Sequence, residues 1–262
     1  MAMPNNTFPV EKAILPSKAP VIFIHGAGGS ALSWPAELRS SRDQRFYFLD
    51  LPGHGKSDQP SHQSIPELAD AVLAFMDSQK IGRAVVIGHS MGGAIALWLA
   101  VHSPKRLLGI GLLSTAANIK VSPEFLLTYD SKASFGRFVQ KVIELSFSEN
   151  ISPRVKELAQ QRLLLTRPTV LYNDFFACSH FDLASKIEKI NLPTLIISGS
   201  NDRMISFGHS LQLNKRIKGS QCHILDGIGH MVLLEQPDQV TTLIRNFLEK
   251  INYTPGLLTS PN

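Results

Sequence analysis

The stretch "VVIGHSMGGAIALWLA", residues 85–100, decides how this chain folds. An apolar, β-branched run stops at Gly88, and a segment rich in alanine and leucine begins shortly after it. This pattern predicts a buried strand that turns directly into a helix, with Ser90 at the turn. Such a turn strains the backbone of the serine and exposes its hydroxyl above the sheet, which favours a nucleophile over an ordinary turn residue. Gly88 and Gly92 are expected to be there because a Cβ at either position would crowd the turn.

Short apolar runs alternate with segments of helical period along most of the chain. Besides the strand before Ser90, strands are predicted at 19–26, 45–53, 107–115, 193–202 and 221–230. The pattern also predicts helices directly after Ser90, at 64–79 and at 236–251, with Ser64 as N-cap of the second and Glu67 closing a capping box. Strands that alternate with helices indicate a mainly parallel sheet with helices on both faces.

Residues 118–186 break this alternation, since their pattern is helical throughout. We interpret them as a helical insertion between two core strands. The predicted organisation is therefore an α/β core formed by residues 1–117 and 187–262, interrupted by the insertion 118–186. A chain of 262 residues is long enough for such a single domain with an insertion.

Composition excludes several classes of protein. The 26 Lys and Arg against 21 Asp and Glu give a net charge of +5, but no basic run of five or more occurs. This predicts a scattered, solvated surface charge and no nucleic-acid partner. The two cysteines, Cys178 and Cys222, lack metal-type spacing, which favours free thiols in a reducing compartment. Without a signal-peptide pattern or an apolar run of roughly 18 residues, we expect a cytoplasmic protein with no membrane partner.

Three side chains capable of joint chemistry follow predicted strands at their carboxyl ends, where ligands of parallel sheets gather. They are Ser90, Asp202 after "TLIISGSN" and His230 after "HILDGIG". Serine needs a base, and the base needs a group that orients it. We predict that Ser90 is the nucleophile, His230 the base and Asp202 the acid that holds the imidazole.

Two backbone N–H groups are predicted to form an oxyanion hole. One belongs to Met91, at the N-terminus of the helix after Ser90, and the other to Ala27 in the glycine-rich turn "HGAGGS". This turn matches neither of two phosphate-binding motifs: Gly-x-x-x-x-Gly-Lys, and Gly-x-Gly-x-x-Gly with an acidic partner further along the chain. We therefore expect no nucleotide.

Five motifs in order, "HGAGGSALSW", "FLDLPGHGKSD", "VVIGHSMGG", "ISGSNDRM" and "GIGHMVLLEQPDQV", resemble the α/β-hydrolase superfamily over residues 19 to 250. Within it the chain is similar to small microbial carboxylesterases. The resemblance implies an eight-stranded, mostly parallel sheet, a helical cap over the active site, and neither cofactor nor metal. Because only some 20 residues precede "VIFIHG", the usual antiparallel edge hairpin is expected to be short or partly missing.

The predicted reaction is hydrolysis of small or medium carboxylic esters through an acyl-enzyme. Carbon–carbon hydrolases of ring-cleavage products, which this family resemblance also includes, use the same three side chains. Those enzymes usually carry a tryptophan directly after the catalytic histidine, where this chain has Met231. Acyl transfer and, from another class, a non-catalytic small-molecule receptor are further alternatives. The sequence leaves the oligomeric state open.

Residues of the insertion are expected to determine the substrate. Its aromatic and leucine side chains either line an acyl pocket or pack the insertion onto the core, and packing is favoured; they are Phe125, Leu126, Leu127, Phe135, Phe138, Phe175 and Phe176. Arg137, Arg162 and Arg167 are candidates for contact with a substrate carboxylate.

Overall fold

One parallel sheet forms the centre of the protein. The computed structural model describes residues 18–42, 44–126, 131–251 and 253. Within them, six strands lie in the order β2-β1-β3-β4-β5-β6, and every neighbouring pair is parallel. The strands are β1 (Pro20–Ile24), β2 (Arg45–Leu49), β3 (Ala84–His89), β4 (Leu107–Leu113), β5 (Thr194–Gly199) and β6 (Gln221–Leu225). Each lies in a segment predicted as a strand, so the α/β class is confirmed.

The expected number of eight strands is wrong for the part of the chain that the structure describes, which has six. The eight came from the superfamily resemblance rather than from apolar runs in this sequence. β2 is the edge strand beside β1 in the described sheet, and the described residues between them form the short helices η1 (Ala31–Ser33) and α1 (Ala36–Arg39). An edge hairpin before β1 falls on residues 1–17, which lie outside the described residues.

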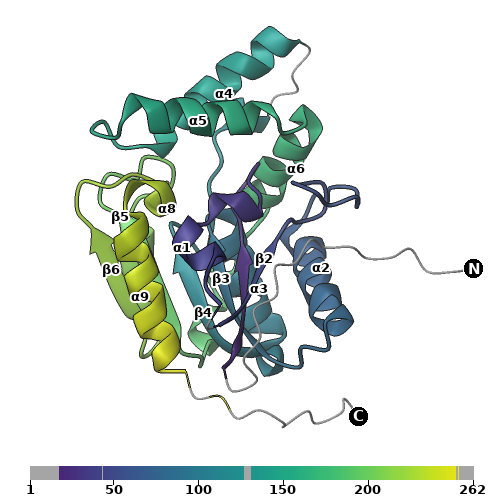
Figure 1. Cartoon of the computed structure of the whole chain (residues 1–262), viewed down its shortest axis with the longest axis vertical. Helices are drawn as coiled ribbons and strands as arrows, with labels where there is room; N and C mark the ends of the chain where they lie inside the picture. The colour runs from purple at the N-terminus through teal and green to yellow at the C-terminus, as the bar shows by residue number, and fades with distance from the viewer. Residues whose placement is uncertain (1–17, 43, 127–130, 252, 254–262) are drawn as a thin grey trace, which may run out of the picture.

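Helices cover both faces of the sheet (Figure 1). Alternate residues of β1 point to opposite faces, with Ile22 and Ile24 in one buried cluster and Val21 and Phe23 in another. The first cluster includes side chains of α2 (Ile65–Ser78), α3 (Met91–His102) and α7 (Gly208–Arg216). The second includes those of α1, α8 (Val232–Glu235) and α9 (Pro237–Glu249). Both faces are therefore apolar, which explains why the strands read as continuous apolar runs.

The predicted helix at 64–79 is confirmed as α2, with Ser64 as its N-cap, whereas a complete capping box with Glu67 is not found among the described residues. The Ser64 hydroxyl accepts a hydrogen bond from the N–H of Glu67 at 3.3 Å and donates to its carboxylate at 2.7 Å. The buried face consists of the apolar positions that set the helical period, namely Ile65, Leu68, Ala69, Val72, Phe75 and Met76. Local capping and burial of one face together fix where this helix begins and how it lies.

Between β4 and β5 the chain is helical, as predicted. It forms η3 (Pro123–Leu126), α4 (Lys132–Ser146), α5 (Pro153–Leu164), α6 (Pro168–Ser179) and η4 (Ile187–Lys189). We call residues 132–179 the α4–α6 segment; it lies together at one end of the sheet (Figure 1). An antiparallel bridge between Asn118 and Asp182 joins the chain before it to the chain after it. The exact division into 1–117, 118–186 and 187–262 stays a prediction.

Candidate active site

Ser90 occupies the turn between β3 and α3. Its backbone has φ +53° and ψ −117°, a conformation that is strained for a residue with a Cβ. Its N–H donates to the carbonyl of Leu113 at 2.8 Å, and its carbonyl accepts from the Thr115 hydroxyl at 2.9 Å. Leu113 ends β4 and Thr115 follows it, so the neighbouring strand holds Ser90 in this conformation.

The two glycines around Ser90 are required by close backbone approach, as the sequence predicts. A Cβ on Gly88 would lie 2.0 Å from the carbonyl oxygen of Gly92. A Cβ on Gly92 would lie 2.2 Å from the carbonyl oxygen of Ile24, in β1. Helix α3 can therefore begin directly against the ends of β1 and β3 only because these two positions carry no side chain.

Asp202 and His230 form a buried pair after β5 and β6. The Nδ1–H of His230 donates to Asp202 Oδ2 at 2.8 Å, and the two residues are only 4% and 7% exposed, respectively. The other carboxylate oxygen, Oδ1, accepts the N–H groups of Met204 at 2.9 Å and Ile205 at 2.8 Å. The Asp202 carboxylate accepts at Nδ1, so the histidine proton lies on that nitrogen, which leaves the Nε2 lone pair to act as a base.

The turn after β1 presents an unoccupied backbone donor. The carbonyl of Gly26 accepts from His25 Nδ1–H at 2.8 Å and from the N–H of Gly29 at 3.0 Å. Since the N–H and C=O of a trans peptide point in opposite directions, the N–H of Ala27 points away from these partners. No acceptor within the described residues takes the N–H of Ala27 or that of Met91, the first residue of α3.

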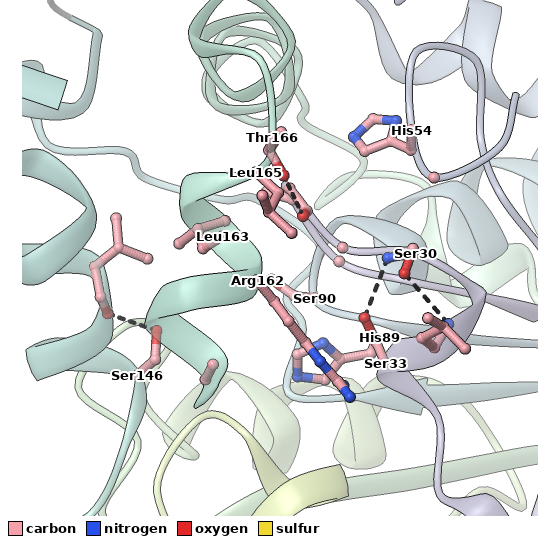
Figure 2. A pocket seen from close by; sticks show the side chains of 18 of the residues that line it. Ser30, Ser33, His54, His89, Ser90, Ser146, Arg162, Leu163, Leu165 and Thr166 are labelled. Carbon is pink, nitrogen blue, oxygen red and sulfur yellow. Dashed lines mark hydrogen bonds between the residues drawn. The ribbon is translucent and has the colours of Figure 1, made fainter. Parts of the chain in front are cut away.

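Ser90, His230 and Ala27 all line one cavity of about 980 Å³. Figure 2 shows Ser90 and His89 among the lining residues, together with Arg162, Leu163, Leu165 and Thr166 of the α4–α6 segment. Between these two described residues, Ser90 and His230, the structure has no direct hydrogen bond. Catalytic hydrogen bonds commonly tighten only when substrate binds. The arrangement brings the serine and the histidine to one cavity, and their catalytic roles stay predictions.

The cavity has an apolar wall and a polar side. The apolar wall includes Val142, Ile143, Phe147, Leu163, Phe175 and Leu234. Of the side chains considered for an acyl pocket, Phe175 lines the cavity; Leu127 lies outside the described residues. The others pack: Phe125, Leu126, Phe135 and Phe138 in an apolar cluster with side chains of α4 and α6, and Phe176 against Tyr172 and His180. Among the described lining residues, Arg162 and Arg167 are the cations with permanent charge and Asp58 is the only carboxylate.

Two further histidines at the site are held neutral. Burial, followed by the nearby charge of His230, lowers the pKa of His89 to about 3, and its Nε2–H donates to the carbonyl of His230 at 3.0 Å. Burial and the charge of His54 hold the pKa of His25 well below its usual value, and its Nε2 accepts the N–H of Leu51 at 3.2 Å. Both residues therefore act as fixed hydrogen-bonding groups of the two turns.

A third histidine joins the core to the α4–α6 segment. His54, in the loop after β2, contacts Asp174 Oδ2 through Nε2 at 2.8 Å, and each side chain is 1% exposed. Asp174 Oδ2 also accepts the N–H of Gly28 at 2.7 Å. In the sequence, Asp174 lies in the helical insertion and His54 in the glycine-containing turn "PGHG". No local signal identifies a contact between residues 120 positions apart.

The described residues meet the requirements of neither a metal site nor a membrane-spanning helix. No group of three or more His, Cys, Asp or Glu in the described part of the chain is arranged to hold a metal ion. Within the same residues no helix has the length and apolar character needed to cross a membrane.

Residues 19–237 match the family model described as alpha/beta hydrolase fold. The chain belongs to the alpha/beta hydrolase fold family. This agrees with the position of Ser90 after a central strand and with the Ser, Asp, His chain order, which are features of the family.

Relatives within the family differ in chemistry. The chain is 27% identical to 3-oxoadipate enol-lactonase 1 of Acinetobacter baylyi, over 90% of this chain and 91% of that protein. It is 26% identical to 2-hydroxy-6-oxo-2,4-heptadienoate hydrolase of Pseudomonas putida, over 87% and 88% of the two chains. The crystal structure of the enol-lactonase from Burkholderia xenovorans LB400 superposes with a TM-score of 0.82 at 25% identity, covering 93% of this chain and 96% of that one.

Proposed function

We propose that this alpha/beta hydrolase cleaves carboxylic esters, cyclic esters included, through an acyl-enzyme on Ser90. The observation that carries the proposal is the 2.8 Å bond between Asp202 and His230, beside a cavity that also contains the strained Ser90. A histidine whose Nδ1–H is held by a carboxylate presents Nε2 as a general base. The superfamily resemblance of the sequence motifs supports the same assignment.

The reaction follows from the positions of these groups. Ser90 Oγ attacks the acyl carbon while His230 Nε2 takes its proton, and Asp202 stabilises the imidazolium. The N–H groups of Ala27 and Met91 donate to the oxyanion of the tetrahedral intermediate. His230 then protonates the leaving alcohol, and water repeats the sequence to release the acid.

The cavity favours substrates with an apolar part. Its apolar wall, on the side of Phe147 and Phe175, is suited to an acyl or ring group of small to medium size. We assign the α4–α6 segment the role of a cap, because its residues supply much of this wall. The relatives whose names specify enol-lactones support cyclic esters as one class of substrate.

A comparison of two serine variants tests the proposal. Wild type, Ser90→Ala and Ser57→Ala are assayed with p-nitrophenyl esters of increasing acyl length and with small lactones. Ser57 is the matched control, since it lines the same cavity. Loss of Ser90 is expected to lower kcat by on the order of 10⁴–10⁶, with Ser57→Ala unchanged. A fluorophosphonate probe should label wild type and Ser57→Ala only; an unlabelled wild type would indicate a non-catalytic receptor.

A second candidate is hydrolysis of a carbon–carbon bond. The relative named as a heptadienoate hydrolase favours it, although Met231 lines the cavity where such hydrolases usually carry tryptophan. A dienoate ring-cleavage product that loses its yellow colour on mixing, with no turnover of any ester, would establish this reaction instead.

A further inference from the structure

Gly28, in the turn that carries Ala27, is bonded to the α4–α6 segment through both of its backbone polar groups. Its N–H donates to Asp174 Oδ2 at 2.7 Å, and its carbonyl accepts from the Thr166 hydroxyl at 3.0 Å, a bond drawn in Figure 2. The same segment packs directly on it, since a Cβ on Gly28 would lie 2.5 Å from Leu163 Cδ1. The α4–α6 segment therefore contacts the turn itself as well as the space above it.

The direction of the Gly28 N–H defines the turn. The bond from Gly29 N–H to the Gly26 carbonyl closes a β-turn with Ala27 and Gly28 at its centre. Gly28 has φ +65°, whereas Ala27 is not among the residues with positive φ, which identifies a type II turn. Rotation of the Ala27–Gly28 peptide would convert it to type I and point a carbonyl at Asp174. The Asp174 carboxylate thus favours the orientation in which the Ala27–Gly28 peptide points its N–H at the carboxylate. This peptide directly follows the one that carries the Ala27 N–H.

At this buried position Asp174 pairs with His54. The Nδ1 of His54 lies 3.0 Å from the carbonyl of Pro52, which only accepts, so Nδ1 carries a proton. Its Nε2 lies 2.8 Å from Asp174 Oδ2, which already accepts from Gly28. Although burial lowers the pKa of His54, the charge and hydrogen bond of Asp174 raise it overall. The contact and the raised pKa of His54 together favour the doubly protonated imidazole beside Asp174.

Other titratable groups near the pair do not replace either partner. The ring of His25 lies 4.7 Å from that of His54 and is neutral, and burial raises the pKa of the Cys178 thiol. The carboxylate of Asp50 accepts two other backbone N–H groups. The exposed Arg167 donates to a carbonyl of the loop after β2 at 3.3 Å. The second oxygen of Asp174 is buried and has no partner among the described residues, so His54 is its only counter-charge at hydrogen-bond distance.

We propose that Asp174 is a positioning residue for the oxyanion turn, and that it holds the Gly28 amide in place only while His54 is doubly protonated. This inference rests on the proposed ester hydrolysis, in which Ala27 supplies an oxyanion donor. The α4–α6 segment then fixes the position of the oxyanion turn. An ion pair outside the three reacting side chains thereby determines how well the tetrahedral intermediate is stabilised.

Asparagine cannot replace Asp174 without loss, which makes Asp174→Asn an informative variant of nearly equal shape. A single oxygen accepts from both Gly28 and His54. With an amide oxygen there, the now neutral His54 cannot donate from both ring nitrogens; with an amide nitrogen there, the Gly28 N–H loses its acceptor. At least one of the three hydrogen bonds must break.

Steady-state kinetics on a p-nitrophenyl ester test the positioning role. Asp174→Asn is expected to lower kcat by about 10²-fold with KM within about threefold, because either orientation of the amide loses the ion pair that holds the oxyanion turn, while substrate contacts remain. The control is Asn173→Ala, because Asn173 also bonds α6 to the core, through Ser61 and Gln63, without touching the turn. It should keep kcat within about threefold. The proposal is overturned if folded Asp174→Asn keeps wild-type kcat, or if Asn173→Ala loses as much.

An NMR titration of the wild-type protein tests the coupling without any variant or substrate. Both ring nitrogens of His54 should be protonated at pH 7, and the Gly28 amide proton should shift with the same midpoint when His54 loses its proton at higher pH. A neutral His54 at pH 7, or a Gly28 signal that ignores the titration, would overturn the proposal. If wild type cleaves no ester, the proposed function fails by itself, and this titration still decides whether Asp174 and His54 act together.

Discussion

Lowering the pH from 7 to 5 is expected to destabilise the wild-type protein more than a His89→Gln variant. The folded protein keeps His89 neutral because burial and the charge of His230 lower its pKa to about 3. The unfolded chain has an ordinary histidine with a pKa of about 6.5. Below that pH the unfolded state binds a proton that the folded state does not, so stability falls as the pH falls.

The size of the effect follows from this difference. Where the unfolded histidine is protonated and the folded one is not, the free energy of unfolding falls by about 1.4 kcal/mol per pH unit, or by about 5 kcal/mol between pH 6.5 and pH 3. Between pH 7 and pH 5 the contribution of His89 alone is about 2 kcal/mol. His25 acts in the same direction, because its pKa is also held well below the usual value. Glutamine can place an amide N–H near the Nε2 position that donates to the His230 carbonyl, and it does not titrate.

Urea unfolding at pH 7, 6 and 5 measures this difference. The comparison uses the change in free energy of unfolding with pH in each protein, so that a constant loss of stability in His89→Gln cancels. Carboxylates and the other histidines titrate in both proteins and cancel to first order. An equal pH dependence in wild type and variant would refute the claim that buried, neutral His89 opposes folding in acid.

Three further outcomes are expected. Gly88→Ala should abolish folded protein, since its Cβ would lie 2.0 Å from a backbone oxygen. Gly136→Ala in helix α4 should instead raise the free energy of unfolding by about 0.5–1 kcal/mol, because its Cβ would have nothing within 4 Å. Soluble yield and thermal unfolding measure the two outcomes. Arg162→Gln should reduce kcat/KM about fivefold for esters that carry a carboxylate and leave kcat/KM for neutral esters unchanged. The reason is that this exposed guanidinium lines the cavity and has no ion-pair partner among the described residues. Assays of matched charged and neutral esters give the ratio of their kcat/KM values in each protein. Since His54 has a raised pKa, the stability from its pair with Asp174 is fully present below the unfolded-state pKa of about 6.5 and is lost as the pH rises through the folded-state pKa. The difference in unfolding free energy between wild type and Asp174→Asn should therefore shrink as the pH is raised above about 6.5, which urea unfolding at a series of pH values measures.

The strands and the serine turn could be predicted because their signals are local. Apolar runs that end in glycine mark strands buried on both faces, and Gly88 and Gly92 report backbone contacts that exclude a Cβ. Asp202 and His230 could be paired without a structure because both follow strands of one parallel sheet, whose carboxyl ends meet at one edge.

Other expectations needed the structure. The number of strands came from a resemblance and proved too high for the described residues. Whether a phenylalanine packs or lines a cavity depends on how α4, α5 and α6 lie on one another, and only Phe175 of those considered lines the cavity. Helical period identifies a buried face without identifying what covers it.

By itself, the sequence determined the layered α/β core, the strained position of Ser90 and the three strand ends where reacting groups lie, because short-range sterics and burial act within a few residues of each position. Only the tertiary structure decided that His54 meets Asp174 and that this carboxylate holds the Gly28 amide. That contact joins residues 120 and 146 positions apart, and it exists because packing excludes water from both side chains. Residue type and sequence spacing do not identify such a long-range contact, since a buried acid can pair with different residues in different tertiary arrangements.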